Sequence, residues 1–467
     1  MSGYEIMTVN ERQQWQAGEV RDFSAENEAV IEHRWPDVLR YLAASNTPVV
    51  TEYITNKNET TLCVNGIHLS SCYDRNEEIK LQAGLVANAA ETVWVYGVGV
   101  GDLPRYLLEN KRFVQINVVV MSSSVFKSSM HYFDHREWLS DPRINLYLPE
   151  QLDAFQVPFC TVPACLKLVD AIAVKLRDEV VLEINTPFIH KKYQENKSHV
   201  INLEDNIELV RNDKDAIALF EGFSDKTKEK VYITAAGPSL ADNLNVIKER
   251  DEDTLLITVD AALPVLRRSS IVPDVVVSID SAKDSIGRYL DLEGNLSDGG
   301  SDSADSEQCR DVSGYTNVPL VYFPVVNNQV LLSWPGPRYV AYSRNTIYDE
   351  LMALYPRAQL YSAGSVIHPA VDLAVKMGGK CIHLFGVDLS FPGGVSHTEG
   401  VPGSKPTYQV GMQREVMNGE GNMVPSWPNM IGYLRDLERY IANNNSIRFI
   451  NMSRKGAVIS GTRYSDE

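Results

Sequence analysis

The segment Val231-Tyr-Ile-Thr-Ala-Ala-Gly-Pro-Ser-Leu240 decides the fold of this chain. Its first residues favour a β-strand, the run breaks at Gly237-Pro238, and an amphipathic helical pattern begins at Leu240. Glycine lets the backbone approach a ligand closely, and Ser239 can cap the helix. The N–H groups and the dipole at a helix start favour a bound phosphate. The segment therefore predicts a strand, a tight turn and a helix, either as an ordinary connection or as a phosphate site.

Strands and helices alternate downstream of this segment. The predicted strands are Val231–Thr234, Thr254–Val259, Val275–Ile279, Leu320–Phe323 and Cys381–Phe385. Such alternation is typical of a mostly parallel sheet with helices on both faces, so we expect a Rossmann-like, doubly wound α/β domain. The polar, glycine-rich stretch 294–306 has too little apolar area to order itself and predicts a flexible insertion or a lid.

A second, smaller α/β unit is predicted near the N-terminus. Strands Thr92–Tyr96 and Ile116–Val120 flank the turn Gly97-Val-Gly-Val-Gly101 and the helix Asp102–Asn110. The glycines resemble the first loop of Rossmann-like nucleotide-binding units, including those of methyltransferases. Those sites usually carry an acidic residue after the second strand, where this chain has Met121. We therefore expect a structural Rossmann unit that lacks this cofactor.

The length of 467 residues predicts two or three domains. We expect an N-terminal domain at 1–150, a helical bridging region at 151–228 and a central Rossmann-like domain at 229–410. A helical C-terminal part at 411–467 would close onto the central domain.

Composition excludes several classes of function. The net charge of −17 disfavours nucleic acid and anionic membranes as partners, although a local basic pocket is allowed. No apolar run approaches about 18 residues, and the first residues lack the pattern of a signal peptide. The six cysteines form no Cys-x-x-Cys pair, so neither a zinc site nor a disulfide framework is expected. A cytoplasmic protein is the expectation.

Ligands of open α/β sheets bind at the carboxyl ends of the strands, so polar residues that follow a strand are the candidate site. They are Gly237, Pro238, Ser239, Asp260, Asp280, Ser281 and Asp388, with the helix-opening turn Ser362-Ala-Gly364-Ser365 as a second phosphate cradle. Each alone is also typical of a cap or a turn. Together they favour a nucleotide pocket.

His397 follows the last of these strands, in a loop with acidic neighbours Asp388 and Glu399 that are expected to raise its basicity. A histidine near neutral pKa suits a general base that takes a proton from a hydroxyl. His368 is the rival, but it lies at a predicted helix start, which disfavours the imidazolium ion.

The ordered motifs resemble those of the Maf family, the motility-associated factors that glycosylate bacterial flagellin. The resemblance rests on Gly237-Pro-Ser-Leu240, on the segment from Pro273-Asp274 to Asp280-Ser281, on Ser362-Ala-Gly-Ser-Val366, and on Gly386-Val-Asp-Leu389 followed by His397. His68-Leu-Ser-Ser, Tyr73-Asp74, the 418–427 stretch and the 456–461 tail extend it over nearly the whole chain.

The resemblance implies a sialyltransferase-like central domain that moves pseudaminic or legionaminic acid from a CMP-activated donor to serine or threonine of flagellin, in support of motility. The central fold also resembles enzymes that pyrophosphorylate 6-hydroxymethyldihydropterin.

Three hypotheses follow from the sequence. The first is a CMP-sugar-dependent O-glycosyltransferase with His397 as base and Asp280 in the catalytic site, with no tightly bound cofactor and no metal site. The second is a pterin pyrophosphokinase, in which Asp260 and Asp280 hold Mg²⁺ for ATP. The third is a flagellin-binding module without activity. The metal requirement, the sugar and any homo-oligomer are left open by the sequence.

Overall fold

The structure is a computed structural model that describes residues 21–45, 49, 51–56, 59–84, 86, 89–152, 154–224, 229–282, 289–290, 313–399, 401 and 414–466. The predicted insertion at 294–306 lies outside these residues. The chain divides into two compact units, Met1–Ile184 and Asn185–Glu467.

Unit 1 is built on a small parallel sheet. Among the residues described there, four strands run in the order β6-β5-β4-β7, all in parallel pairs. Their bounds are β4 Thr92–Tyr96, β5 Gln115–Val119, β6 Ile144–Tyr147 and β7 Phe159–Thr161. The helices are α1 Ser24–Arg34, α2 Pro36–Ala44, α3 Arg75–Ala83, α4 Asp102–Glu109, α5 Ser123–Tyr132 and α6 Arg136–Ser140, with 3₁₀ turns at η2 Pro149–Gln151, η3 Cys165–Lys167 and η4 Ala171–Ala173.

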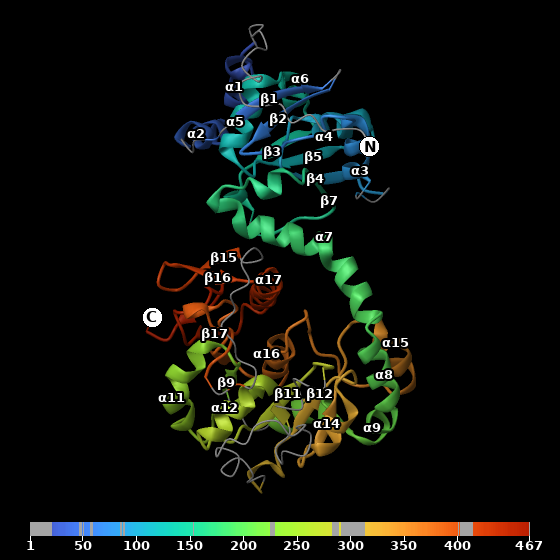
Figure 1. The fold of residues 1–467 in the computed structure, drawn as a ribbon, viewed down its shortest axis with the longest axis vertical. Coiled ribbons are helices and arrows are strands. Elements are labelled where there is room, and N and C mark those ends of the chain that lie inside the picture. The colour runs from blue at the N-terminus through green and yellow to red at the C-terminus, as the bar shows by residue number, and fades with distance from the viewer. Residues whose placement is uncertain are drawn as a thin grey trace, which may run out of the picture. The chain divides into compact units, whose positions relative to one another are not determined.

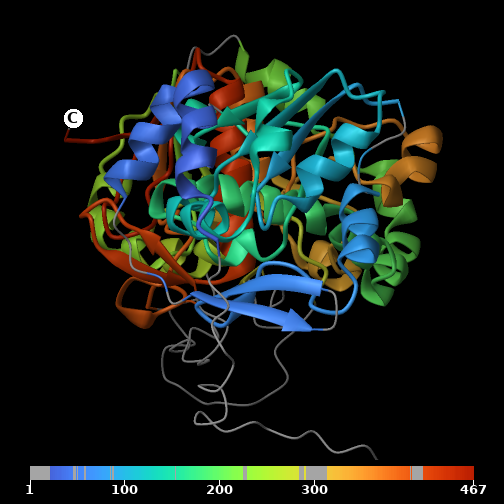
Figure 2. The same ribbon diagram turned by 90° about the horizontal axis from the view of Figure 1, so that it is seen from above.

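Antiparallel strands β1 Thr51–Asn56, β2 Glu59–Val64 and β3 Ile67–His68 form a separate sheet in unit 1 (blue in Figure 2). The break between α1 and α2 falls at Pro36, where a proline begins the new helix because its missing N–H is not needed there. Helix α7 Val174–Gln194 runs from unit 1 into unit 2.

Unit 2 is built on the large parallel sheet that the sequence predicts. Within its described residues, nine strands run in the order β18-β17-β14-β9-β10-β11-β12-β13-β8, and every pair is parallel. The bounds are β8 Lys214–Asp215, β9 Lys230–Thr234, β10 Leu255–Val259, β11 Val275–Ser278, β12 Leu320–Tyr322, β13 Arg338–Val340, β14 Cys381–Phe385, β17 Arg448–Asn451 and β18 Arg463–Tyr464. The prediction of a Rossmann-like α/β fold is confirmed.

Helices accompany the large sheet in unit 2 (Figure 1). They are α8 Lys197–Asp205, α9 Ile207–Asn212, α10 Ile217–Ser224, α11 Leu244–Lys248, α12 Leu263–Arg268, α14 Asn328–Ser333, α15 Asp349–Leu354, α16 Ile367–Lys376 and α17 Pro428–Asn443. Short 3₁₀ turns are η5 Pro238–Asn243, η6 Asp260–Ala262, η8 Ser313–Tyr315, η9 Thr346–Tyr348 and η10 Pro392–Gly394, and β15 Arg414–Met417 pairs with β16 Met423–Ser426. Helix α16 packs on β9 and β10.

The central strands of the sheet in unit 2 are buried. All five residues of β10 and all four of β11 are buried, as expected for central parallel strands that are covered on both faces. From β9 the strand order proceeds through β10 to β13, and β14 returns on the other side of β9. The topological switch point therefore lies between β9 and β14, and the carboxyl ends of these strands form the edge where ligands of such sheets bind.

Candidate active site

The predicted Gly237-Pro-Ser239 turn lies at the switch point, but its polar groups are occupied by the chain itself. The carboxylate of Asp388 accepts hydrogen bonds from the backbone N–H of Ser239 at 2.8 Å and from its hydroxyl at 2.5 Å. The N–H of Gly237 donates to the carbonyl of Gly386 at 2.9 Å, that of Leu240 donates to Gly237, and Pro238 has none. No N–H of this turn is left to bind a phosphate. The phosphate cradle predicted at Ser239 is therefore not supported, because Asp388 takes the position of the anion.

The glycine at this turn is needed for close packing. A Cβ atom on Gly237 would lie 2.5 Å from a carboxylate oxygen of Asp388 and would also meet the carbonyl of Gly386. Gly456, from the C-terminal segment, approaches Asp388 in the same way. Burial raises the pKa of Asp388, whereas the hydrogen bonds from Ser239 lower it. Asp388 therefore holds two turns together and is 2% exposed.

Asp260 is also engaged within the protein. One of its carboxylate oxygens accepts from the hydroxyl of Ser278 and the other from the N–H of Ala261, both at 2.7 Å. It is 3% exposed, and burial raises its pKa to about 7, with the charge of Asp280 adding to the rise. A carboxyl group with this environment exists partly in the neutral form near neutral pH, which suits a hydrogen-bonding role better than ion binding.

Asp280 differs from these two carboxylates because it is exposed at the end of β11. Its charge acts on Asp260, on Tyr193 and His199, and on Tyr433 of α17. Asp280 is therefore the point at which groups from the sheet, from α7 and α8, and from α17 converge. Ser281, next to it, is buried, and its carbonyl accepts from the side-chain amide of Asn202.

The Ser362-Ala-Gly364-Ser365 turn keeps free donors at the start of α16. In the described part of the chain, no hydrogen bond engages the N–H groups of residues 364–367. Gly364 has φ +89° and packs against the ring of Tyr433, so a side chain here would be both strained and blocked. Since α16 is ten residues long, its dipole adds to these donors. This turn fits an anion better than the turn at Ser239 does.

A cation lies at the same edge. Tyr342 and Gln359 form a parallel bridge, so the segment that continues to Arg344 runs beside the segment that leads to Ser362. Arg344 is exposed and forms no ion pair or hydrogen bond with any residue that the structure describes. An unpaired guanidinium is suited to a phosphate or carboxylate, as are the free N–H groups on the neighbouring segment. Arg344 was not predicted from the sequence because it follows β13, a strand that was not predicted.

His397 lies beside the end of β9, since the N–H of Thr398 donates to the carbonyl of Ala236 at 2.9 Å. Its Nδ1 lies 3.0 Å from the hydroxyl of Ser396. Burial lowers the pKa of His397, which is opposite to the rise expected from Asp388 and Glu399. His368, the rival, is buried with Nδ1 and Nε2 against the carbonyls of Ser365 and Tyr433, and burial lowers its pKa to about 4.

The glycine turn of unit 1 is filled by side chains of the same unit. A Cβ atom on Gly97 would meet Cys165, one on Gly99 would lie 3.0 Å from Val162, and one on Gly101 would lie 2.6 Å from the ring of His135. These contacts account for all three glycines without a ligand.

A carboxylate does lie beyond β5, where nucleotide-binding units have an acid, but it comes from Asp170. It accepts from the hydroxyl of Ser122, from the N–H and hydroxyl of Ser123, and from the hydroxyl of Tyr41 at 2.7–2.9 Å. Its hydrogen bonds thus close the start of α5 from within.

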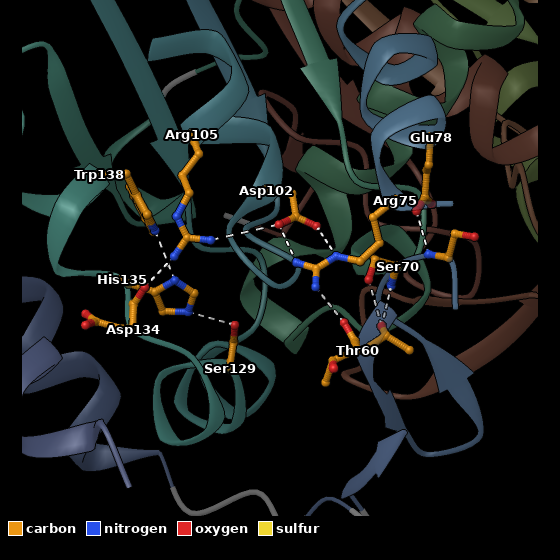
Figure 3. Close-up of polar contacts among 12 residues, drawn as sticks. Thr60, Ser70, Arg75, Glu78, Asp102, Arg105, Ser129, Asp134, His135 and Trp138 are labelled. Carbon is orange, nitrogen blue, oxygen red and sulfur yellow. Dashed lines mark hydrogen bonds and ion pairs between the residues drawn. The ribbon is translucent and has the colours of Figure 1, made fainter. Parts of the chain in front are cut away.

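Ser70 and Arg75, from the polar stretch 68–75 of unit 1, belong to a structural network (Figure 3). Arg75 pairs with both oxygens of Asp102 and donates to the carbonyl of Thr60 at 2.7 Å, while Asp74 caps α3. The contacts of Arg75 join β2 to α3 and α4. In the same view, His135 accepts from the indole N–H of Trp138 at 3.0 Å.

Among the described residues, no group of three His, Cys, Asp or Glu side chains is placed to hold a metal ion. In the same residues, no helix is both long enough and apolar enough to cross a bilayer.

Residues 197–394 match the family model described as 6-hydroxymethylpterin diphosphokinase MptE-like. The matched region begins at the first residue of α8. The resemblance to the Maf family predicted a domain of this type, and the match supports that resemblance. No curated protein sequence matches the chain.

Similar solved structures include a Maf glycosyltransferase from Magnetospirillum magneticum AMB-1, with 16% identity and a TM-score of 0.41 over 95% of this chain and 74% of that one. Spermidine synthase from Thermotoga maritima is 12% identical with a TM-score of 0.23, over 27% of this chain and 49% of its own. Thiamine pyrophosphokinase from Bacillus subtilis is 17% identical with a TM-score of 0.15, over 34% and 47%. At these TM-scores the likenesses carry no argument about activity.

Proposed function

We propose that this chain is a glycosyltransferase that moves a nonulosonic acid, pseudaminic or legionaminic acid, from its CMP-activated form to serine or threonine hydroxyls of flagellin. The observation that carries the proposal is a set of groups able to bind an anion that follow the parallel strands. It combines the free N–H groups of residues 364–367 with the unpaired Arg344, while Asp280 lies exposed at the end of β11. The choice of donor and acceptor rests on the motif resemblance to the Maf family.

Because the CMP-sugar is already activated, the main role of the protein is to position the donor and the acceptor hydroxyl. As the bond between the anomeric carbon and the phosphate oxygen breaks, negative charge grows on the departing CMP. Fixed N–H groups at the start of α16 and the guanidinium of Arg344 stabilise that charge without reorganisation. Asp280 is placed to accept hydrogen bonds from sugar or ribose hydroxyls. A histidine at this edge takes the proton of the acceptor hydroxyl, and a single displacement inverts the anomeric centre.

A second candidate function is favoured by the family match itself. A pterin pyrophosphokinase would bind ATP and Mg²⁺, and carboxylates are the ligands that Mg²⁺ prefers. Asp280 fits such a role because it is exposed. Asp260 fits it poorly, since both of its oxygens already accept hydrogen bonds and burial raises its pKa to about 7. We therefore place the transferase first.

Ligand-induced thermal stabilisation separates the candidates. A ligand at 100 times its dissociation constant adds about 2.7 kcal/mol to the stability of the folded protein. We expect CMP and CTP to stabilise the protein in EDTA, and flagellin to gain the mass of one nonulosonic acid per site when the CMP-sugar is supplied. Stabilisation by ATP that is abolished by EDTA, with no shift from cytidine nucleotides, would instead establish the pyrophosphokinase. Binding of flagellin without transfer would point to the non-catalytic module.

A further inference from the structure

Helix α8 lies across the carboxyl edge of β11 and β12. The amide of Asn202 donates to the carbonyls of Ser281 at 3.2 Å and Val325 at 2.7 Å. One turn later, Asn206 donates to the carbonyls of Pro324 at 2.8 Å and Val326 at 2.6 Å. Both asparagines are buried, and these bonds fix the helix over the strand ends.

His199 lies one turn before Asn202 and therefore on the same face of α8. It is 7% exposed, and its ring packs against that of Tyr193, with 4.2 Å between the centroids. Its Nδ1 lies 2.8 Å from the carbonyl oxygen of Tyr193. A carbonyl only accepts, so Nδ1 carries the hydrogen and, in the neutral ring, Nε2 carries the lone pair. No residue in the described part of the chain hydrogen-bonds Nε2.

His368, His383 and His190, also in unit 2, lack this arrangement. His368 has both ring nitrogens against carbonyls, which leaves no lone pair for a substrate. His383 lies within β14, and His190 is exposed on α7. His397 faces the hydroxyl of Ser396, which either donates or accepts, so that contact does not fix which nitrogen carries the hydrogen. His199 combines a fixed hydrogen, a free nitrogen and the influence of a carboxylate.

We propose that His199 is the general base of the transferase, with Asp280 as the carboxylate that stabilises its protonated form. This inference rests on the proposed function. In the step, the acceptor hydroxyl gives its proton to Nε2 of His199 and its oxygen forms a bond to the anomeric carbon. The bond from that carbon to the phosphate oxygen breaks, and its electron pair leaves with CMP. His397, the base expected from the sequence, is the competing assignment.

The electrostatic surroundings agree with this role. Burial lowers the pKa of His199, while the bond to the carbonyl of Tyr193 and the charge of Asp280 raise it. The neutral, proton-accepting form is therefore the resting state near neutral pH, and Asp280 favours the imidazolium ion once the proton arrives. The titratable groups around the ring are Asp280 and Tyr193, and burial raises the pKa of Tyr193 to about 12. Tyr193 thus stays neutral over the working range.

The test compares three glutamine variants, His199→Gln, His397→Gln and His190→Gln, in transfer from the CMP-sugar to flagellin. Removal of a general base typically costs 10²–10⁴-fold in turnover. We expect His199→Gln to lose at least 100-fold in kcat, with KM for the CMP-sugar within about threefold of wild type and without the acidic limb of the pH profile. His190→Gln is the control and keeps wild-type rates. A loss of under tenfold in folded His199→Gln, or a base-like loss confined to His397→Gln, would overturn the assignment.

A second measurement does not depend on whether the His199→Gln variant folds. It also separates the base assignment from the proposed transferase function. In ¹⁵N-histidine-labelled wild-type protein, NMR reports the tautomer and the pKa of His199 directly. We expect hydrogen on Nδ1 in the neutral ring and a lower pKa in Asp280→Asn; hydrogen on Nε2, or an unchanged pKa, contradicts the pair. Wild-type protein that transfers from no CMP-sugar refutes the proposed function, and the base assignment falls with it. The NMR result still decides whether His199 and Asp280 are coupled.

Discussion

Replacement of Asp388 by alanine tests whether the turn at Ser239 is closed by the chain itself. Asp388 is 2% exposed and accepts two hydrogen bonds from Ser239, through its N–H at 2.8 Å and its hydroxyl at 2.5 Å. Alanine leaves both donors buried without an acceptor, which costs about 1–3 kcal/mol for each. Loss of a buried carboxylate returns part of that cost, because burial disfavours its charged form. We expect a net destabilisation of about 3 kcal/mol.

Hydrogen exchange of backbone amides measures the loss of local stability at the Ser239 turn. A loss of about 3 kcal/mol in local stability corresponds to exchange that is about 100-fold faster, since 1.4 kcal/mol is a factor of ten. We expect that acceleration in peptides that contain Ser239, together with a fall in the urea midpoint of the full chain. Asp242→Ala is the matched control. Asp242 belongs to the same 3₁₀ turn, but its ion pair with Lys455 is half exposed, so its loss is expected to cost under 1 kcal/mol.

The stability difference between wild type and Asp388→Ala is also expected to change with pH in one direction only. The pKa of Asp388 is raised in the folded state, so folded protein holds this proton more tightly than unfolded protein does. Stability of wild type relative to Asp388→Ala is therefore greatest at acid pH and declines as pH rises from 3.8 through the raised folded pKa. If Asp388→Ala exchanges like Asp242→Ala, or if the difference grows with pH, the turn is not held by Asp388.

Three further outcomes follow from the contacts. Arg344→Gln, with no partner to lose among the described residues, is expected to raise KM for the CMP-sugar about tenfold without a change in melting temperature; equal KM would remove Arg344 from the site. Gly364→Ala combines φ +89° with a clash against Tyr433, so we expect loss of cytidine-nucleotide stabilisation in thermal-shift assays, and retained binding would contradict the cradle. Burial lowers the pKa of His135 to about 3. Its neutral form is favoured in the folded state, so stability is full above pH 6.5 and falls as pH drops towards 3, by about 4 kcal/mol; urea midpoints that stay flat over this range would refute it.

Periodicity in the sequence predicts the strands of the sheet well, but it does not predict which helix lies across the strand ends. The strand Cys381–Phe385 has the predicted bounds, and β9 begins one residue before its predicted start at Val231. These strands are long apolar runs between turn residues, a pattern that is local in sequence. The three residues of β13 carry no such pattern.

The candidate site was predictable only in part because its contacts join distant segments. Asp280 and the Gly364 turn follow predicted elements, so their residue types were a sufficient guide. His199 lies on a helix within the region that was predicted to be a bridge. Its place over the sheet depends on Asn202 and on strand ends more than 70 positions later. Listing the polar residues that follow predicted strands does not identify residues on a helix that lies across the strand ends.

Three glycine turns, at Gly97, Gly237 and Gly364, separate what a glycine motif predicts from what it does not. A glycine shows that something approaches the backbone closely, but the approaching group is Cys165 at Gly97, Asp388 at Gly237 and the ring of Tyr433 at Gly364. What distinguishes the third turn is that the N–H groups of residues 364–367 remain unbonded in the described part of the chain, on a segment that runs beside the one leading to the unpaired Arg344. An anion is bound by free donors rather than by glycines, so the candidate anion site moves from the turn at Ser239, whose donors have acceptors, to the turn at Gly364.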